Sequence, residues 1–103
     1  MNPLISKYEA KVAEKPENEL FRFSLAKALI DAGRHAEAEP HLEWAFAKKP
    51  DWMVVVMLLA QCALQRGDTT GARGWYEKAL TLALDQKHEA PEAEIRAALS
   101  RLD

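Results

Sequence analysis

The chain has little of what marks secreted or membrane-spanning proteins. A single cysteine, Cys62, excludes an intramolecular disulfide. The longest apolar run extends from Trp52 to Leu64 with an interruption at Gln61, and it is too short to span a bilayer, which takes about 20 residues. The opening residues, MNPLISKYEAKVAEKPE, contain no apolar secretory core. We therefore expect a cytoplasmic protein.

An excess of charge of one sign is also missing. The formal net charge is −2 at pH 7, and acidic and basic residues are interspersed along the whole length. A nucleic acid or an anionic membrane would require a concentrated basic surface, so neither is an expected partner. With 103 residues, of which 49% are hydrophobic and 29% charged, the composition is that of one small globular domain.

Residue patterns that carry catalysis or hold cofactors are absent as well. The glycine-containing stretch 67–74 lacks the preceding strand and the lysine of a phosphate-binding loop. Glu37 and His41 lie four residues apart but have no third candidate ligand nearby for a metal ion. Cys62 lies in an apolar segment without a neighbouring base. We expect no enzyme activity, no cofactor and no metal site.

What the sequence does contain is an internal repeat with a step of 34 residues. The step pairs residues of like size and type: Pro16 with Pro50, Leu25 with Leu59, Ala26 with Ala60, Gly33 with Gly67, Ala38 with Ala72, Leu42 with Tyr76, Ala45 with Ala79 and Phe46 with Leu80. Extended backwards, the same step aligns residues 4–16 with the second half of a unit. A period of this length predicts helix-turn-helix units that stack on one another.

The repeated residues resemble the pattern of the tetratricopeptide repeat family. The first full unit supplies Leu25-Ala26, Leu29, Gly33, Ala38, Leu42, Ala45 and Pro50, and the second supplies Leu59-Ala60, Ala63, Gly67-Asp68, Ala72, Tyr76 and Ala79. Arg22 and Val56 replace the family's early tryptophan. Leu84 replaces the closing proline of the second unit, so the last helix of that unit is expected to continue toward His88. The resemblance implies an all-α fold of antiparallel helix pairs in a right-handed solenoid.

Local signals agree with this fold. The recurring alanines let helix backbones approach closely, and the leucines fill the space between them. Gly33 and Gly67 are expected in the left-handed conformation at helix ends, with Asp51 and Asp68 as N-caps. Pro40, near the start of its helix, predicts a slight bend. We expect six helices, at 3–14, 18–32, 36–48, 52–66, 70–88 and 91–102.

We expect these helices to form one domain over residues 1–103. It would comprise a half repeat at 3–16, full repeats at 17–50 and 51–84, and a capping helix at 91–102. The capping helix has an apolar stripe formed by Ile95, Ala98, Leu99 and Leu102, which suits the exposed end of a solenoid. This cap argues against further repeats after it, whereas the half repeat leaves open a longer array before it.

The family resemblance also implies a binding site, because the first helix of each pair lines a concave groove in this fold. The groove residues so implied are Leu20, Phe23, Lys27, Ile30, Asp31, Val54, Met57, Gln61, Leu64 and Gln65. Phe23 and Met57 stand where relatives that clamp acidic chaperone tails carry polar or basic residues. An apolar or amphipathic helix of a partner protein fits this groove better. Alternatively, the C-terminal helix or a second copy of the chain covers it.

Trp44 and Trp75 lie on the second helices, one place off the core stripe. They mark either a second interface or plain packing against a neighbouring helix. Taken together, these patterns indicate a non-catalytic protein-binding module, which in the family would be an adaptor or co-chaperone. The alternative is a structural unit that self-assembles, for example as a homodimer, with the groove occupied by its own copy.

Overall fold

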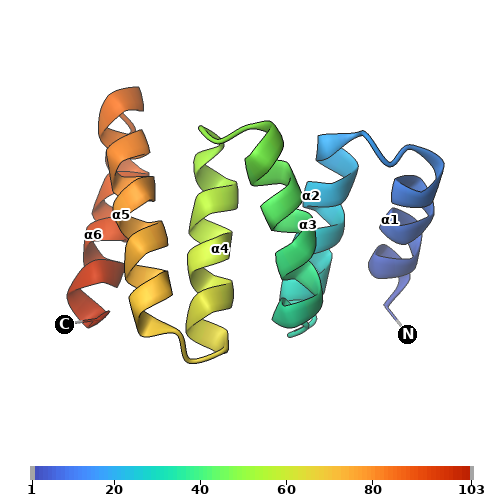
Figure 1. Ribbon diagram of the computed structural model, residues 1–103, viewed down its shortest axis with the longest axis horizontal. Helices are drawn as coiled ribbons and strands as arrows, with labels where there is room; N and C mark the ends of the chain where they lie inside the picture. Colours follow the sequence, from blue (N-terminus) through green and yellow to red (C-terminus); the bar gives the residue numbers. More distant parts are fainter. Residues whose placement is uncertain (1, 103) are drawn as a thin grey trace. The chain divides into compact units, whose positions relative to one another are not determined.

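The computed structural model describes residues 2–102, which form six α-helices and no strand (Figure 1). The helices are α1 (Pro3–Glu14), α2 (Glu19–Asp31), α3 (His35–Lys48), α4 (Met53–Gln65), α5 (Thr69–Gln86) and α6 (Glu89–Leu102). Every bound lies within two residues of the prediction from the sequence, and the all-α fold class is confirmed.

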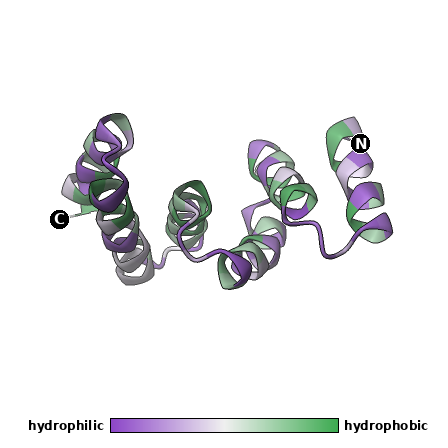
Figure 2. Ribbon diagram, turned by 90° about the horizontal axis from the view of Figure 1, so that it is seen from above, coloured by the Kyte–Doolittle hydropathy of each residue, from purple (hydrophilic) through white to green (hydrophobic). Residues whose placement is uncertain are grey.

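The chain divides into two compact units, of which the first ends at Lys49 and the second starts at Pro50. In the first unit α2 packs against both α1 and α3, and in the second α5 packs against both α4 and α6. Figure 2 shows α4 as the most uniformly hydrophobic helix, and it contains no charged residue. None of the helices in the described range is long and apolar enough to cross a bilayer.

Each helix pair is held by the repeated small and large residues. The completely buried alanines of the first unit are Ala26, Ala38 and Ala45, and the corresponding alanines of the second are Ala60, Ala72 and Ala79. Leucines at the repeat positions between them are almost completely buried too. Burying one such leucine stabilises the fold by roughly 1.5–3 kcal/mol, so these few positions account for much of the core.

Helix starts follow the predicted capping chemistry at one aspartate and not at the other. The Asp68 carboxylate accepts a hydrogen bond from the Gly71 amide at 2.8 Å, as predicted. The prediction for Asp51 is wrong, because α4 begins one residue later than expected. Its N-cap is Trp52, which makes no side-chain capping bond, and Asp51 instead accepts a hydrogen bond at its main-chain carbonyl from Gln86 Nε2 at 3.2 Å.

Helix ends at α2 and α4 have the conformation that the glycines predict. Gly33 and Gly67 have φ angles of 78° and 80°, in the left-handed region where a Cβ is unfavourable. Helix α5 ends in the same region at Lys87, with φ 57°, although no glycine is present. A residue with a Cβ costs about 1–2 kcal/mol in this conformation. The α5 helix continues past Leu84, where the full repeat would end, and its last residue is Gln86, two residues before His88.

Two prolines, Pro40 and Pro91, lie inside helices beyond the first helical position. Helix α3 begins at His35, so Pro40 falls beyond its first turn, where proline removes a helical hydrogen bond. Pro40 is exposed, and α3 nevertheless continues past it to Lys48. The bend at Pro40 remains a prediction. Helix α6 begins two residues earlier than expected, which places Pro91 third in the helix. The first-turn amides have no helical partner, so proline is tolerated there.

We predict that Gly74→Ala stabilises the protein by about 1 kcal/mol, the difference in helix propensity. Gly74 is exposed within α5, and a Cβ added to it would meet nothing within 4 Å. Gly71→Ala is the matched control, because its Cβ would clash with the Asp68 carboxylate and disturb the cap, a loss of roughly 1 kcal/mol. Urea unfolding followed by circular dichroism should show a gain for the first variant only; equal gains would contradict this account of the cap.

Candidate protein-binding surface

Four residues of α2 form an exposed stripe, which we call the α2 stripe: Leu20, Phe23, Lys27 and Ile30. Their spacing of three and four positions places them on one helix face. Leu20 is 63% exposed, Phe23 and Ile30 are partly buried, and Lys27 is exposed. Lys27 Nζ lies 3.8 Å from Asp31 Oδ1. Both side chains of this ion pair are exposed, so solvent screens the attraction between them. The stripe is therefore mostly apolar, and its one charge, on Lys27, is paired with the neighbouring Asp31.

The second unit carries the corresponding α4 stripe, formed by Val54, Met57, Gln61 and Leu64. Val54 is 44% and Leu64 40% exposed, while Met57 and Gln61 are partly buried. Gln65 beside them is exposed. Both stripes thus follow the order apolar, apolar, polar, apolar, at positions related by the repeat step. The structure exposes all or part of each predicted groove residue, and a single groove formed by both stripes remains a prediction.

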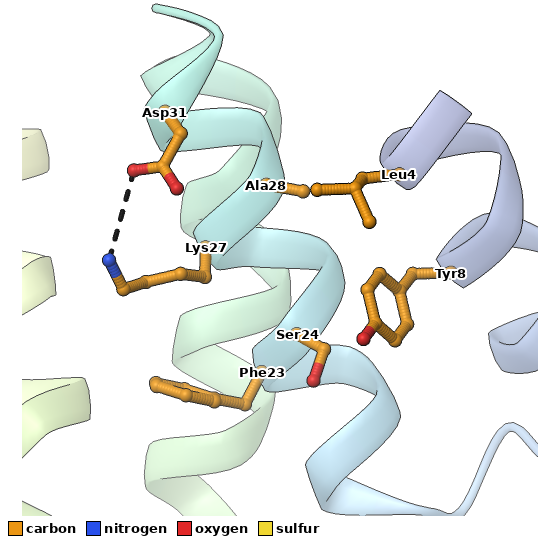
Figure 3. A pocket seen from close by; sticks show the side chains of 7 residues that line it. All are labelled: Leu4, Tyr8, Phe23, Ser24, Lys27, Ala28 and Asp31. Carbon is orange, nitrogen blue, oxygen red and sulfur yellow. Dashed lines mark ion pairs between the residues drawn. The ribbon is translucent and has the colours of Figure 1, made fainter. Parts of the chain in front are cut away.

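Within the first unit, a depression of about 190 Å³ lies between α1 and α2 (Figure 3). It is lined by Leu4, Tyr8, Phe23, Ser24, Lys27, Ala28 and Asp31. Leu4 and Tyr8 project from α1 toward α2, with Leu4 directed at Ala28 and Tyr8 toward Ser24. Three predicted groove residues, Phe23, Lys27 and Asp31, are brought together here.

Sequence reasoning missed the part of this depression that α1 supplies. Leu4 is 54% exposed and Tyr8 is partly buried, although the repeat step aligns them with the buried Ala38 and Leu42. The repeat step alone did not reveal this, because it aligns residues 4–16 with positions that are buried in the two full units.

Trp44 is covered by cations of its own unit. The guanidinium carbon of Arg22 lies 4.4 Å from the centroid of the Trp44 ring, and Lys48 Nζ lies 5.2 Å from it. Arg22 Nε also donates to the Pro16 carbonyl at 3.0 Å, which holds the guanidinium in place. Cation–π contacts of this kind contribute roughly 0.5–1 kcal/mol at exposed sites. Trp44 and Trp75 are both partly buried, and their role as a second interface remains a prediction.

Of the two candidate metal ligands, Glu37 is paired with Arg34. Glu37 accepts two hydrogen bonds of 2.6 Å from Arg34, which lower the pKa of its carboxyl group. Cys62 is buried in α4. Within residues 2–102, no three histidine, cysteine or acidic side chains gather in a way that could hold a metal ion.

His41 lies partly buried in α3, and its Nδ1 atom is buried without a hydrogen-bond partner. Burial lowers the pKa of His41 below its ordinary value of 6.5, and the positive charge of Arg22 on α2 lowers it further. Glu9 on α1 acts in the opposite direction with a smaller effect. The folded chain therefore favours the neutral imidazole.

We predict that the free energy of unfolding falls as the pH drops through 6.5, because the unfolded chain then binds a proton that folded His41 resists. His41→Phe should flatten this dependence between pH 7.5 and 5.5. His88→Phe, at an exposed position, is the control and should leave it in place. Urea titrations at several pH values measure the effect, and an unchanged slope in the His41 variant would show that another group is responsible.

Comparison with known proteins agrees with the helix pairs and the 34-residue step, which together define a helical repeat protein. The model of the tetratricopeptide repeat (TPR) family matches residues 23–89. TPR repeat-containing protein PA0015 of Pseudomonas aeruginosa is 31% identical over 100 residues, which cover 97% of this chain and 95% of the relative. The chain belongs to the tetratricopeptide repeat family.

Solved structures share the fold over nearly the whole chain. The solution structure of protein BPP2914 from Bordetella parapertussis is 29% identical with a TM-score of 0.86, covering 99% of this chain and 89% of that one. PcrH of Pseudomonas aeruginosa, in complex with the chaperone binding region of PopD, is 22% identical with a TM-score of 0.86, covering 95% and 74%. The type III secretion translocator chaperone SycD of Yersinia enterocolitica is 14% identical with a TM-score of 0.88, covering 95% and 68%.

Proposed function

We propose that this chain is a non-catalytic module that binds a segment of a partner protein on the α2 and α4 stripes, as an adaptor or co-chaperone does. The observation that carries the proposal is the repetition of one exposed pattern on the first helix of both pairs. Leu20, Val54 and Leu64 are large apolar residues that remain between 40% and 63% exposed. Packing within the pairs does not require them there, so their exposure favours contact with another molecule.

The charges of the stripes favour an apolar or amphipathic segment. The α4 stripe has no charged residue, and the Lys27 charge on the α2 stripe is paired with Asp31. A strongly acidic or basic segment would lose hydration on these surfaces without gaining a counter-charge. Residues three and four positions apart on a helix suit the apolar face of a second helix. Met57 adds a flexible side chain that adapts to the shape of its neighbour.

The structural relatives support binding of a protein segment. PcrH has been solved with the chaperone binding regions of PopD and of PopB, and SycD is itself a chaperone. A shared fold at low identity does not transfer their partners to this chain. It supports the coarser inference that a chain of this fold binds a segment of another protein.

Self-association is the competing function, because a second copy would bury the same exposed residues. In a homodimer, Leu20, Val54 or Leu64 of one copy would contact an apolar face of the other. The mass in solution separates the two functions. A monomer of 11.6 kDa that persists on dilution leaves the stripes available to a different protein.

We predict that Phe23→Glu and Met57→Glu each abolish capture of a partner from lysate of the source cells, because each places a charge on an apolar contact. Helix content and mass should not change, since both residues are only partly buried. Thr70→Glu, which adds the same charge at an exposed position of α5, is the control and should retain capture.

The same variants also test self-association. If the wild-type chain is a dimer and Phe23→Glu or Met57→Glu makes it monomeric by light scattering, the stripes serve self-assembly. Dissociation by Trp44→Ala instead would place the dimer interface on α3. Unchanged capture and unchanged mass in both stripe variants would contradict the proposed surface.

A further inference from the structure

A polar cluster lies between α2 and α3 of the first unit, and we call it the Arg22–His41–Trp44 cluster after its members. His41 and Trp44 are three positions apart on α3, so their side chains lie on the same face of that helix. The guanidinium carbon of Arg22, on α2, lies 4.4 Å from the centroid of the Trp44 ring. All three residues are partly buried. A titratable imidazole is thus held beside a permanent positive charge.

The second unit carries different residues at the corresponding positions. The 34-residue step carries Arg22 onto Val56 and His41 onto Trp75, neither of which titrates. Val56 is 0% exposed, so the place of an apolar core residue in the second unit is taken by a cation in the first. The single histidine of the second unit, His88, is exposed. A response to acid that originates in a partly buried histidine therefore belongs to the first unit.

The surroundings of His41 provide no partner for a second ring proton. Its Nδ1 atom is buried and makes no hydrogen bond with the described residues. Arg22 is held in place, because its Nε donates to the Pro16 carbonyl at 3.0 Å while its guanidinium stacks on Trp44. Protonation would leave a buried N–H without an acceptor and place two positive charges next to each other. Both effects destabilise the closed pair of helices.

Other charged groups near His41 change this balance little. Glu9 on α1 favours the protonated ring, but it is exposed and its effect is smaller than that of the guanidinium. Glu37, one turn before His41 on α3, is paired with Arg34. Lys48, whose Nζ lies 5.2 Å from the indole centroid of the cluster, is a further cation on the same helix. The pKa of His41 accordingly lies below its ordinary value, chiefly through burial.

We propose that protonation of His41 opens the α2–α3 pair of the first unit while the helices of the second unit stay packed. Separation of the two helices gives the imidazolium water as a hydrogen-bond acceptor and moves it away from Arg22. The closed pair loses stability relative to the open one as the pH falls through 6.5, because the open form binds the proton that the closed form resists. The first unit is thereby an acid-sensitive switch.

The switch would also change the proposed binding surface. The α2 stripe lies on one of the two helices that separate, whereas the α4 stripe lies in the unit that stays packed. This consequence alone rests on the proposed function. The experiment below needs no partner protein, so its failure would overturn the switch and leave the proposed function untouched.

Hydrogen exchange of backbone amides in low concentrations of urea tests the switch, because it separates local opening from global unfolding. Amides of α2 and α3 should exchange through an opening whose urea dependence is clearly weaker than that of global unfolding, since less surface is exposed. The equilibrium constant of this opening should rise between pH 7.5 and 5.5. The limit is about tenfold, reached if only the open form binds the proton at one pH unit below 6.5.

Matched variants assign the effect to the cluster. His41→Phe should remove the pH dependence of the local opening, whereas His35→Gln on the same helix and His88→Phe in the second unit should retain it. Arg22→Gln should raise the titration midpoint of the His41 ring, measured by NMR, because it removes the neighbouring positive charge. This ring titration also tests the natural chain without any substitution, and its midpoint should lie below 6.5.

Three results would overturn the inference. The first is exchange of α2 and α3 with the urea dependence of global unfolding at both pH values, since no local opening would then exist. The second is a local opening that is independent of pH, or that keeps its pH dependence in His41→Phe. The third is a ring titration of His41 in the natural chain with a midpoint at or above 6.5.

Discussion

The close approach of paired helices at fully buried alanines is the constraint on which the rest of this structure depends. Ala26 and Ala38 in the first unit, and Ala60 and Ala72 in the second, are completely inaccessible to solvent. A larger side chain at any of them would force the backbones apart and leave the neighbouring leucines without contacts. Because these positions are fixed, the rotation of each helix about its axis is fixed too. That rotation decides which residues face outward.

The exposed surface follows from this arrangement. Helices α2 and α4 turn the same repeat positions outward, so that equivalent residues form the α2 stripe and the α4 stripe. Helix α1 contributes Leu4, which is 54% exposed and lines the depression between α1 and α2. One packing rule therefore accounts for both the core of each pair and the apolar residues available to other molecules.

The predictions that succeeded concern features encoded within one helix or one repeat. The 34-residue step and the glycines at 33 and 67 located all six helices to within two residues. The Asp68 cap was correct because its partner is only three residues away. The Asp51 cap failed because a one-residue shift in the start of α4 removes an aspartate from the capping position. The predicted groove residues lie on exposed or partly exposed faces of α2 and α4. That they form one groove stays a prediction.

The sequence by itself determined the helices, their pairing within repeats and the family, because these depend on local periodicity and on spacings that recur. Only the tertiary structure revealed the depression between α1 and α2 and the stacking of Arg22 on Trp44. These features depend on contacts between residues on different helices, which the repeat spacing does not specify. A repeat pattern specifies what a position would bury against in a complete array. Whether that position is buried is decided by the contacts that the folded chain makes around it.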